Sequence, residues 1–147
     1  MTLLCEWCSR VVGDDAPTAR CVLPIRLHSE PNERQHWSAR ARRTRGQVAV
    51  ARAKLADALR RVLLPHPVGS VAVRITRVAP RRLDADNLAA SAKHVQDGAA
   101  LALGIDDGDA RVRWTYAQRS GGPSVYAVEI DCWVRGEHQT GRAGEGG

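Results

Sequence analysis

The chain of 147 residues has no phenylalanine, a single methionine and only two lysines, Lys54 and Lys93, among its 22 basic residues. It also lacks long apolar runs, since none approaches the ~20 residues that a membrane-spanning helix needs. A basic segment followed by an apolar one, which would indicate a secretory signal, is missing from the N-terminus. We therefore expect a cytoplasmic protein without a membrane partner.

Cysteine is scarce, with four residues in the whole chain. Cys5 and Cys8 have the spacing of a zinc knuckle, and Cys21 is a possible third ligand, but the second pair of a structural zinc site is missing unless His28 contributes. The alternative is a set of reduced thiols, with Cys21 and Cys132 as small strand residues. We favour the second interpretation and expect neither bound zinc nor a disulfide framework.

Composition excludes general disorder, because 44% of the residues are hydrophobic and 26% are charged. The length corresponds to one domain. We expect an N-terminal extension over 1–19, a folded domain over 20–135 and a glycine-rich tail over 136–147. The net charge of +6 is by itself only a weak indication of a polyanionic partner.

Hydrophobic periodicity predicts an α+β fold, in which a small mixed β-sheet packs with two helices in the order β-α-β-α-β-β. Pro24 suggests an edge position for the first strand, and the run 120–123 suggests a hairpin turn between the last two strands. Val48, Leu55, Leu59 and Val62 form the expected apolar stripe of the first helix. The expected strands are 21–27, 70–78, 111–118 and 125–134, and the expected helices are 36–64 and 87–103.

Six of the sixteen acidic residues lie between positions 84 and 109, and all six are aspartate. On extended backbone, side chains two residues apart point the same way, so we expect Asp84 and Asp86 to face one side, with Asp86 or Asn87 capping the following helix. Packed carboxylates repel one another, and a divalent cation relieves that repulsion. Oxygen-only ligands favour Mg²⁺ or Mn²⁺. The six residues are Asp84, Asp86, Asp97, Asp106, Asp107 and Asp109.

A single metal site that uses both ends of this cluster requires the chain after Gly104 to fold back along the second helix, which we expect to be about 25 Å long. A dimer is the other way to bring the two ends together. Each part of the cluster also has a purely structural interpretation, as a helix cap or a solvated turn.

Lys93 lies on the expected helix face that carries Asp86 and Asp97. A surface Lys–Asp pair is one interpretation. However, arginine makes that pair equally well and is ten times as frequent in this chain. A compact ammonium beside a metal site stabilises charge that develops on a phosphate or a leaving oxygen. We therefore favour a catalytic role for Lys93.

The first predicted helix carries a one-sided charge. Nine basic residues and one acid, Asp57, lie between Arg34 and Arg61, whereas a merely solvated helix face usually carries both signs. Such a stripe suits contact with the phosphate backbone of a nucleic acid. The expected DNA-binding residues, near the start of this helix, are Arg34, His36, Arg40, Arg42, Arg43 and Arg45.

Together these motifs resemble the RusA-type Holliday-junction resolvase family, and its phage and prophage members most closely. The resemblance spans about residues 21–134. It is carried by Leu83-Asp84-Ala85-Asp86-Asn87-Leu88, by Lys93 and Asp97, by Gly104-Ile105-Asp106-Asp107-Gly108-Asp109, and by Trp114-Thr115-Tyr116-Ala117-Gln118. Upstream, the Leu23–His28 strand, His36-Trp37 and Arg40–Arg43 are similar as well.

The resemblance implies a RusA-like fold and a homodimeric, Mg²⁺-dependent endodeoxyribonuclease that nicks four-way DNA junctions in recombination and repair. It implies metal ligation by Asp84, Asp86 and Asp107, with Asp106 as a substitute, and a catalytic role for Lys93. One position departs from the family pattern: the lysine usually stands one turn after the second aspartate, where this chain has Ala90. The alternative function is a non-catalytic DNA-binding protein with a structural aspartate cluster.

Overall fold

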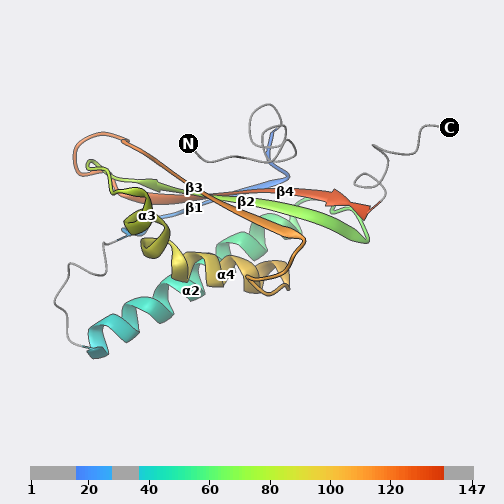
Figure 1. Cartoon of the computed structure of the whole chain (residues 1–147), viewed down its shortest axis with the longest axis horizontal. Coiled ribbons are helices and arrows are strands. Elements are labelled where there is room, and N and C mark those ends of the chain that lie inside the picture. The colour runs from blue at the N-terminus through green and yellow to red at the C-terminus, as the bar shows by residue number, and fades with distance from the viewer. Residues whose placement is uncertain (1–15, 28–36, 138–147) are drawn as a thin grey trace.

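The computed structural model describes residues 16–27 and 37–137, which form one mixed four-stranded sheet with helices on one of its faces (Figure 1). The strand order is β1-β4-β2-β3, in which β2 pairs with β4 antiparallel and with β3 parallel. The strands are β1 (Ala19–Leu23), β2 (Val68–Val78), β3 (Val112–Arg119) and β4 (Ala127–Gly136).

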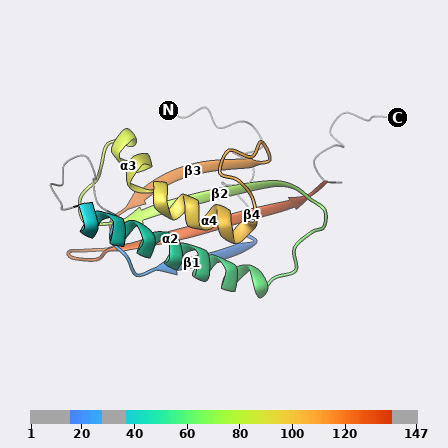
Figure 2. The same ribbon diagram turned by 90° about the horizontal axis from the view of Figure 1, so that it is seen from below.

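Three helices lie in this part of the chain: α2 (Trp37–Arg60), α3 (Ala85–Ser91) and α4 (Lys93–Leu103). Helices α2 and α4 run side by side below the sheet, as two perpendicular views agree (Figures 1 and 2). The mixed α+β class predicted from the sequence is confirmed. None of the helices described here is long and apolar enough to cross a membrane.

The core lies between the sheet and these two helices. Alternate residues of the strands face the helices, among them Val73, Ile75 and Ile130, which are almost completely buried. From the helices, Leu55 and Val95 are fully buried against them. The expected stripe of the first helix is shifted slightly, because its buried positions are Gln47, Ala51, Leu55 and Leu59, whereas Val48 and Val62 are half-buried.

Helix α4 approaches α2 very closely at Gly98. A Cβ added to Gly98 would lie 2.4 Å from the carbonyl oxygen of Val48 and 2.7 Å from the Cβ of Ala51. Only glycine therefore permits this backbone-to-backbone packing, which holds the two helices together over the sheet.

The predicted hairpin between the last two strands is wrong. Strand β3 pairs with β2, and β4 occupies the place between β2 and β1. The run 120–126 therefore crosses the end of β2 instead of making a tight turn. Turn-forming residues such as Gly122, with φ +113°, are compatible with both connections, so they do not reveal which strands pair.

Three predicted element boundaries need correction. The first helix, expected over 36–64, ends at Arg60, where the backbone N–H groups of Arg61 and Val62 donate three residues back, to the carbonyl oxygens of Ala58 and Leu59. The first strand ends at Leu23, before Pro24, although its expected edge position is confirmed. The second predicted helix is broken into α3 and α4 at Ala92, where the Ser91 hydroxyl donates to the Leu88 carbonyl oxygen. Such a bond from a serine side chain to the preceding turn bends a helix. The predicted stop at Gly104 is confirmed by its left-handed φ of 70°.

Candidate active site

The aspartates before α3 cap that helix. Asp84 is the N-cap: its Oδ1 accepts from the backbone N–H of Asn87 at 2.8 Å, and its Oδ2 accepts from the Asn87 side-chain amide at 2.9 Å. The expected cap at Asp86 or Asn87 is wrong, because the helix begins at Ala85. Asp86 consequently lies in the first helical turn and not on extended backbone, so the predicted alternation that would place it on the same side as Asp84 is wrong. Both carboxylates are exposed.

Lys93 begins α4 and binds two carboxylates. Its Nζ lies 2.7 Å from Oδ2 of Asp107 and 3.2 Å from Oδ1 of Asp97. The second contact is the expected pair within one helix, but the first is not, because Asp107 follows the end of α4. The chain beyond Gly104 thus returns along α4 far enough to meet the side chain at its start.

Strand β3 holds the segments that carry these aspartates. Trp114 donates from its indole N–H to the carbonyl oxygen of Asp107 at 2.9 Å. Tyr116 donates its hydroxyl to Gln96 of α4. Gln118 binds the backbone of Leu83 twice, accepting from its N–H at 2.9 Å and donating to its carbonyl oxygen at 2.7 Å.

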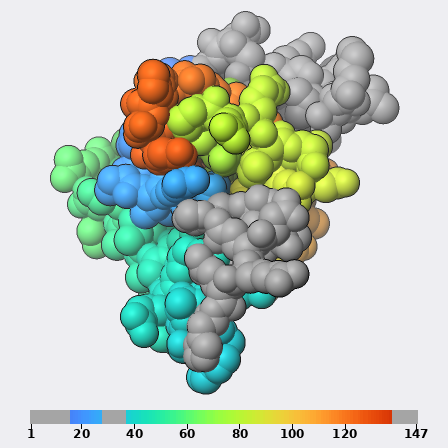
Figure 3. All heavy atoms as spheres, turned by 90° about the vertical axis from the view of Figure 1, so that its left-hand side faces the viewer, coloured from blue at the N-terminus to red at the C-terminus, as the bar shows by residue number. Residues whose placement is uncertain are grey.

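These three side chains of β3 are two residues apart, so they project from one face of the strand. They thereby attach three segments to the same face of the sheet. In order along β3, Trp114 holds the 106–109 loop, Tyr116 holds α4 and Gln118 holds the segment before α3. Trp114 and Gln118 are four residues apart, which places the outer two attachments about 13 Å apart at 3.3 Å per residue. Figure 3 shows the end of the molecule near Gln118, where the yellow-green residues around the start of α3 lie beside the orange connection that follows β3.

The predicted metal ligands share this face but do not converge. Among the described residues, no three histidine, cysteine, aspartate or glutamate side chains are grouped as they would be around a metal ion. The predicted ligands stay apart because they are attached at different points of β3. Asp84 and Asp86 lie near the attachment at Gln118, and Asp106 and Asp107 lie near the attachment at Trp114. Lys93 lies between them in the chain and reaches the second group.

The ion pair of Lys93 shifts the pKa of both partners. The hydrogen bond to Asp107, followed by that to Asp97, raises the pKa of Lys93 above its usual value. The same bond holds the pKa of Asp107 below the range usual for aspartate. Burial raises the pKa of Tyr116, and the nearby Lys93 opposes that rise. At neutral pH Lys93 and Asp107 therefore form a pair of opposite charges.

The end of the same loop is closed by a second ion pair. Arg111 binds Asp109 through Nε at 3.1 Å and Nη2 at 2.9 Å, and its backbone N–H donates to the same carboxylate at 2.9 Å. The side-chain bonds lower the pKa of Asp109 to about 2. Asp109 thus has a structural role in shaping the loop, whereas Asp106, three residues earlier, is exposed.

The expected DNA-binding residues divide between described and undescribed parts of the chain. Arg40, Arg42 and Arg45 lie exposed in the N-terminal half of α2, and Arg43 is half-buried there. Arg34 and His36 lie outside the described residues, as do Cys5, Cys8 and His28 of the possible zinc site. Cys21 and Cys132 are free thiols in neighbouring strands, as expected of small strand residues.

Sequence reasoning missed Gln96, which receives the Tyr116 hydroxyl, and His94, whose Nε2 lies 3.4 Å from the Thr44 hydroxyl of α2. The only sequence signal for Gln96 was the alternation of Trp114, Tyr116 and Gln118, which shows that one face of β3 carries polar atoms that need partners. Neither a family model nor a curated protein matches this chain.

Proposed function

We propose that this protein is an endodeoxyribonuclease that depends on Mg²⁺ and resolves four-way DNA junctions by paired nicks, in recombination and repair. The observation that carries the proposal is the return of the 104–111 loop along α4, which brings Asp107 to within 2.7 Å of Lys93. The motif resemblance between residues 21 and 134 supports it independently of that contact.

The donor chemistry of the aspartates fits Mg²⁺, because exposed carboxylate oxygens are the ligands that this ion prefers. We assign Asp84, Asp86 and Asp107 as its ligands, with Asp106 as a neighbour that can replace one of them; Mn²⁺ prefers the same oxygen ligands. Because these side chains do not converge among the described residues, the assignment rests on their donor chemistry and on the motif resemblance, and it requires the segment before α3 and the 106–109 loop to approach each other around the ion. Once bound, such an ion activates water and stabilises the leaving oxygen of a phosphodiester.

Lys93 contributes positive charge where the substrate phosphate would lie. Its ammonium is held at two points, by Asp97 and Asp107, so it needs little reorganisation to face a developing negative charge. Tyr116 and Gln96 fix the helix that carries it. In this proposal Lys93 stabilises the transition state, while Asp97 positions it.

The N-terminal half of α2 provides the DNA contact in this proposal. Arg40, Arg42 and Arg45 are exposed there, and no acidic residue lies in the first turn of the helix. Charges of this kind bind the phosphate backbone without reading sequence. They bring the junction to the helical side of the sheet, which also carries Lys93.

Paired nicks require two equivalent sites, because a four-way junction has two-fold symmetry. One chain carries one aspartate cluster, so the proposal includes a homodimer. Light scattering at micromolar concentration should give twice the 16.0 kDa of the chain without DNA, and that protein mass plus the mass of the DNA with junction DNA. A strict monomer under both conditions would contradict paired cleavage.

A mobile four-way junction and a linear duplex of the same sequence, each incubated with and without Mg²⁺, test the activity directly. We expect symmetric nicks in the junction with Mg²⁺, little cleavage of the duplex, and none without the ion. Cleavage of neither substrate over a range of Mg²⁺ and Mn²⁺ concentrations would contradict the proposal.

A second function, DNA binding without catalysis, is favoured by a specific observation: several of the aspartates already have structural partners. Asp84 caps α3, Asp107 and Asp97 bind Lys93, and Asp109 binds Arg111. If the protein binds junctions tightly but never nicks them, these structural roles are sufficient to explain the cluster.

A further inference from the structure

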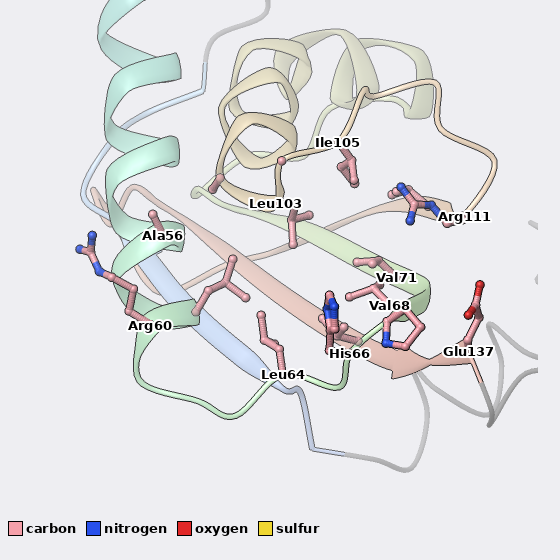
Figure 4. A pocket seen from close by; sticks show the side chains of 16 residues that line it. Ala56, Arg60, Leu64, His66, Val68, Val71, Leu103, Ile105, Arg111 and Glu137 are labelled. Carbon is pink, nitrogen blue, oxygen red and sulfur yellow. The ribbon is translucent and has the colours of Figure 1, made fainter.

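Two hollows lie along α2 on the side that faces α4, and Ala56 and Arg60 line both of them. The first, of about 700 Å³, extends from Thr44 to Arg60 beside Leu101 of α4. The second, of about 570 Å³, continues past the end of α2 to the beginning of β2 (Figure 4). Together they form one groove, which we call the α2 groove.

The floor of the α2 groove is apolar. In the first hollow it consists of Val48, the alanines of α2 and Leu101, whose side chain is 51% exposed although it is large and apolar. In the second hollow Leu64, Val68 and Leu103 point into the space between the helices and the sheet (Figure 4). A floor of this kind is suited to aliphatic or aromatic side chains of a partner.

The rim of the first hollow is basic. Arg45, Arg52 and Arg60 line it, and none of its lining residues in the described part of the chain is acidic. Arg60 lies 3.5 Å from Asp57, which also binds Arg61 at 3.1 Å. The second hollow is lined by His66, by Arg111, which is paired with Asp109, and by Glu137. The excess positive charge of the groove therefore lies along the first hollow.

The spacing of the rim matches a helix. Arg45 and Arg60 are fifteen residues apart on one helix, a span of about 22 Å at 1.5 Å per residue. A partner helix of four turns has the same length. Apolar side chains on one of its faces would contact the floor, and acidic side chains beside them would meet the arginines.

The charge pattern disfavours two other occupants. A second copy of this chain, related by a two-fold axis through the groove, would place one row of arginines against the same row of its partner. Duplex DNA would satisfy the arginines, but its backbone offers nothing apolar for Leu101, Leu64 or Leu103 to contact. Both the rim and the floor are satisfied by an acidic amphipathic helix.

We propose that the α2 groove is a docking site for an acidic amphipathic helix of another protein. This binding does not depend on the metal site proposed above, because the groove contains none of the aspartates assigned to the metal; its rim shares only Arg45 with the proposed DNA contact. It gives the protein a way to be recruited by a protein partner.

The probe for this site is a fluorescein-labelled synthetic helix of about 15 residues, with leucines on one face and glutamates on both flanks. Its control has the same composition with the leucines spread around the helix. Binding is measured by fluorescence anisotropy on the full chain. Two matched pairs of variants locate the site: Arg52→Glu against Lys54→Glu, and Leu101→Gln against Leu63→Gln.

Each control residue in these pairs is exposed but does not line the groove; Leu63, for example, is 98% exposed. We expect Arg52→Glu to weaken binding about tenfold, because reversal of a rim charge replaces an attraction by a repulsion. Leu101→Gln should weaken it several-fold by loss of apolar contact. Lys54→Glu and Leu63→Gln should stay within about twofold of the parent chain.

Equal binding of the two peptides would overturn the proposal, because it would show attraction by net charge alone. The proposal would also be overturned if the two members of each pair of variants changed the peptide affinity equally. If Arg52→Glu weakens only the binding of duplex DNA and the peptide does not bind, the row of arginines is a phosphate-binding surface and the proposal is again overturned. Junction cleavage, measured on the same samples, reports separately on the nuclease proposal.

Discussion

The Nζ of Lys93 lies 2.7 Å from the Oδ2 of Asp107, although fourteen residues and the length of α4 separate them in the chain. This contact exists because the chain reverses at Gly104 and the indole of Trp114 holds the backbone of Asp107. It joins one of the only two lysines of the chain to the aspartate cluster that the sequence identifies.

Asp107→Asn should therefore lower the pKa of Lys93, because it removes the partner that contributes most to the raised value. Asp97→Asn, the matched variant, should lower it less. NMR titration of the Lys93 side chain measures both. A folded-state pKa above the unfolded value of about 10.4 stabilises the fold below that pH, and the contribution disappears as pH rises through the folded-state pKa. Equal effects of the two substitutions would contradict the assigned order of partners.

The metal assignment predicts that Asp86→Asn abolishes cleavage and leaves junction binding unchanged or stronger, because it removes a ligand and a negative charge near phosphate. Asp84 also caps α3, so its two roles need separate variants. Asp84→Asn keeps the capping ability and should lose only cleavage, whereas Asp84→Ala should also lose about 1 kcal/mol of stability. If Asp84→Asn and Asp86→Asn both cut at the parent rate in Mg²⁺, the metal assignment is wrong.

Two glycine substitutions test the packing of α4 on α2. Gly98→Ala should destabilise the protein by about 1–3 kcal/mol, because its Cβ would overlap the backbone of Val48. At Gly46, a Cβ would have no atom of the described residues within 4 Å, so Gly46→Ala should stabilise α2 by about 0.5–1 kcal/mol. Urea denaturation gives both values. Similar stabilities of the two variants would contradict the close approach at Gly98.

The strand thiols should be unreactive at neutral pH. Burial raises the pKa of Cys132 to about 12 and that of Cys21 to about 11, so neither forms a thiolate near pH 7. In a Cys5→Ser, Cys8→Ser background, a thiol reagent at pH 8 should label Cys132 only at the rate of unfolding and Cys21 slowly. Prompt labelling of both in the folded protein would show that β1 opens from β4.

Neutralisation of Arg40, Arg42 and Arg43 should weaken DNA binding and reduce the slope of log K against log salt by about one for each lost phosphate contact. Arg113→Gln is a suitable control, because Arg113 alternates with Trp114 and so belongs to the opposite face of the sheet. An unchanged slope in the triple variant would show that these arginines are merely solvated.

Local sequence signals predicted the helices and strands well. They failed where contacts between distant segments determine the structure, as in the pairing of strands. Gly104 ends α4 because its left-handed conformation is a local property. Pro24 correctly indicated an edge strand, but the strand was expected to continue past it and instead ends at Leu23. The pairing of β3 with β2 is not a local property. Gly122 and its neighbours permit a hairpin between β3 and β4, but β3 pairs with β2, where Val112 and Trp114 pack against the core.

The same distinction applies to the site. Lys93 and Asp97 are one helical turn apart, so their contact was predictable from spacing alone. The contact with Asp107 depends on a loop whose path is set by Trp114, and spacing contains no information about that path. The break at Ala92 was also not predictable, because serine at position 91 is compatible with a continuous helix until its hydroxyl binds Leu88.

The position of β4 also constrains how this protein is made. β4 is the last strand of the described chain, yet it is the only described strand that pairs with β1. During synthesis, Ala19–Leu23 must therefore wait, with its backbone groups exposed, until Ala127–Gly136 has left the ribosome. Helices α2 and α4 can form earlier, so the nascent chain offers chaperones an unpaired N-terminal strand for most of its translation.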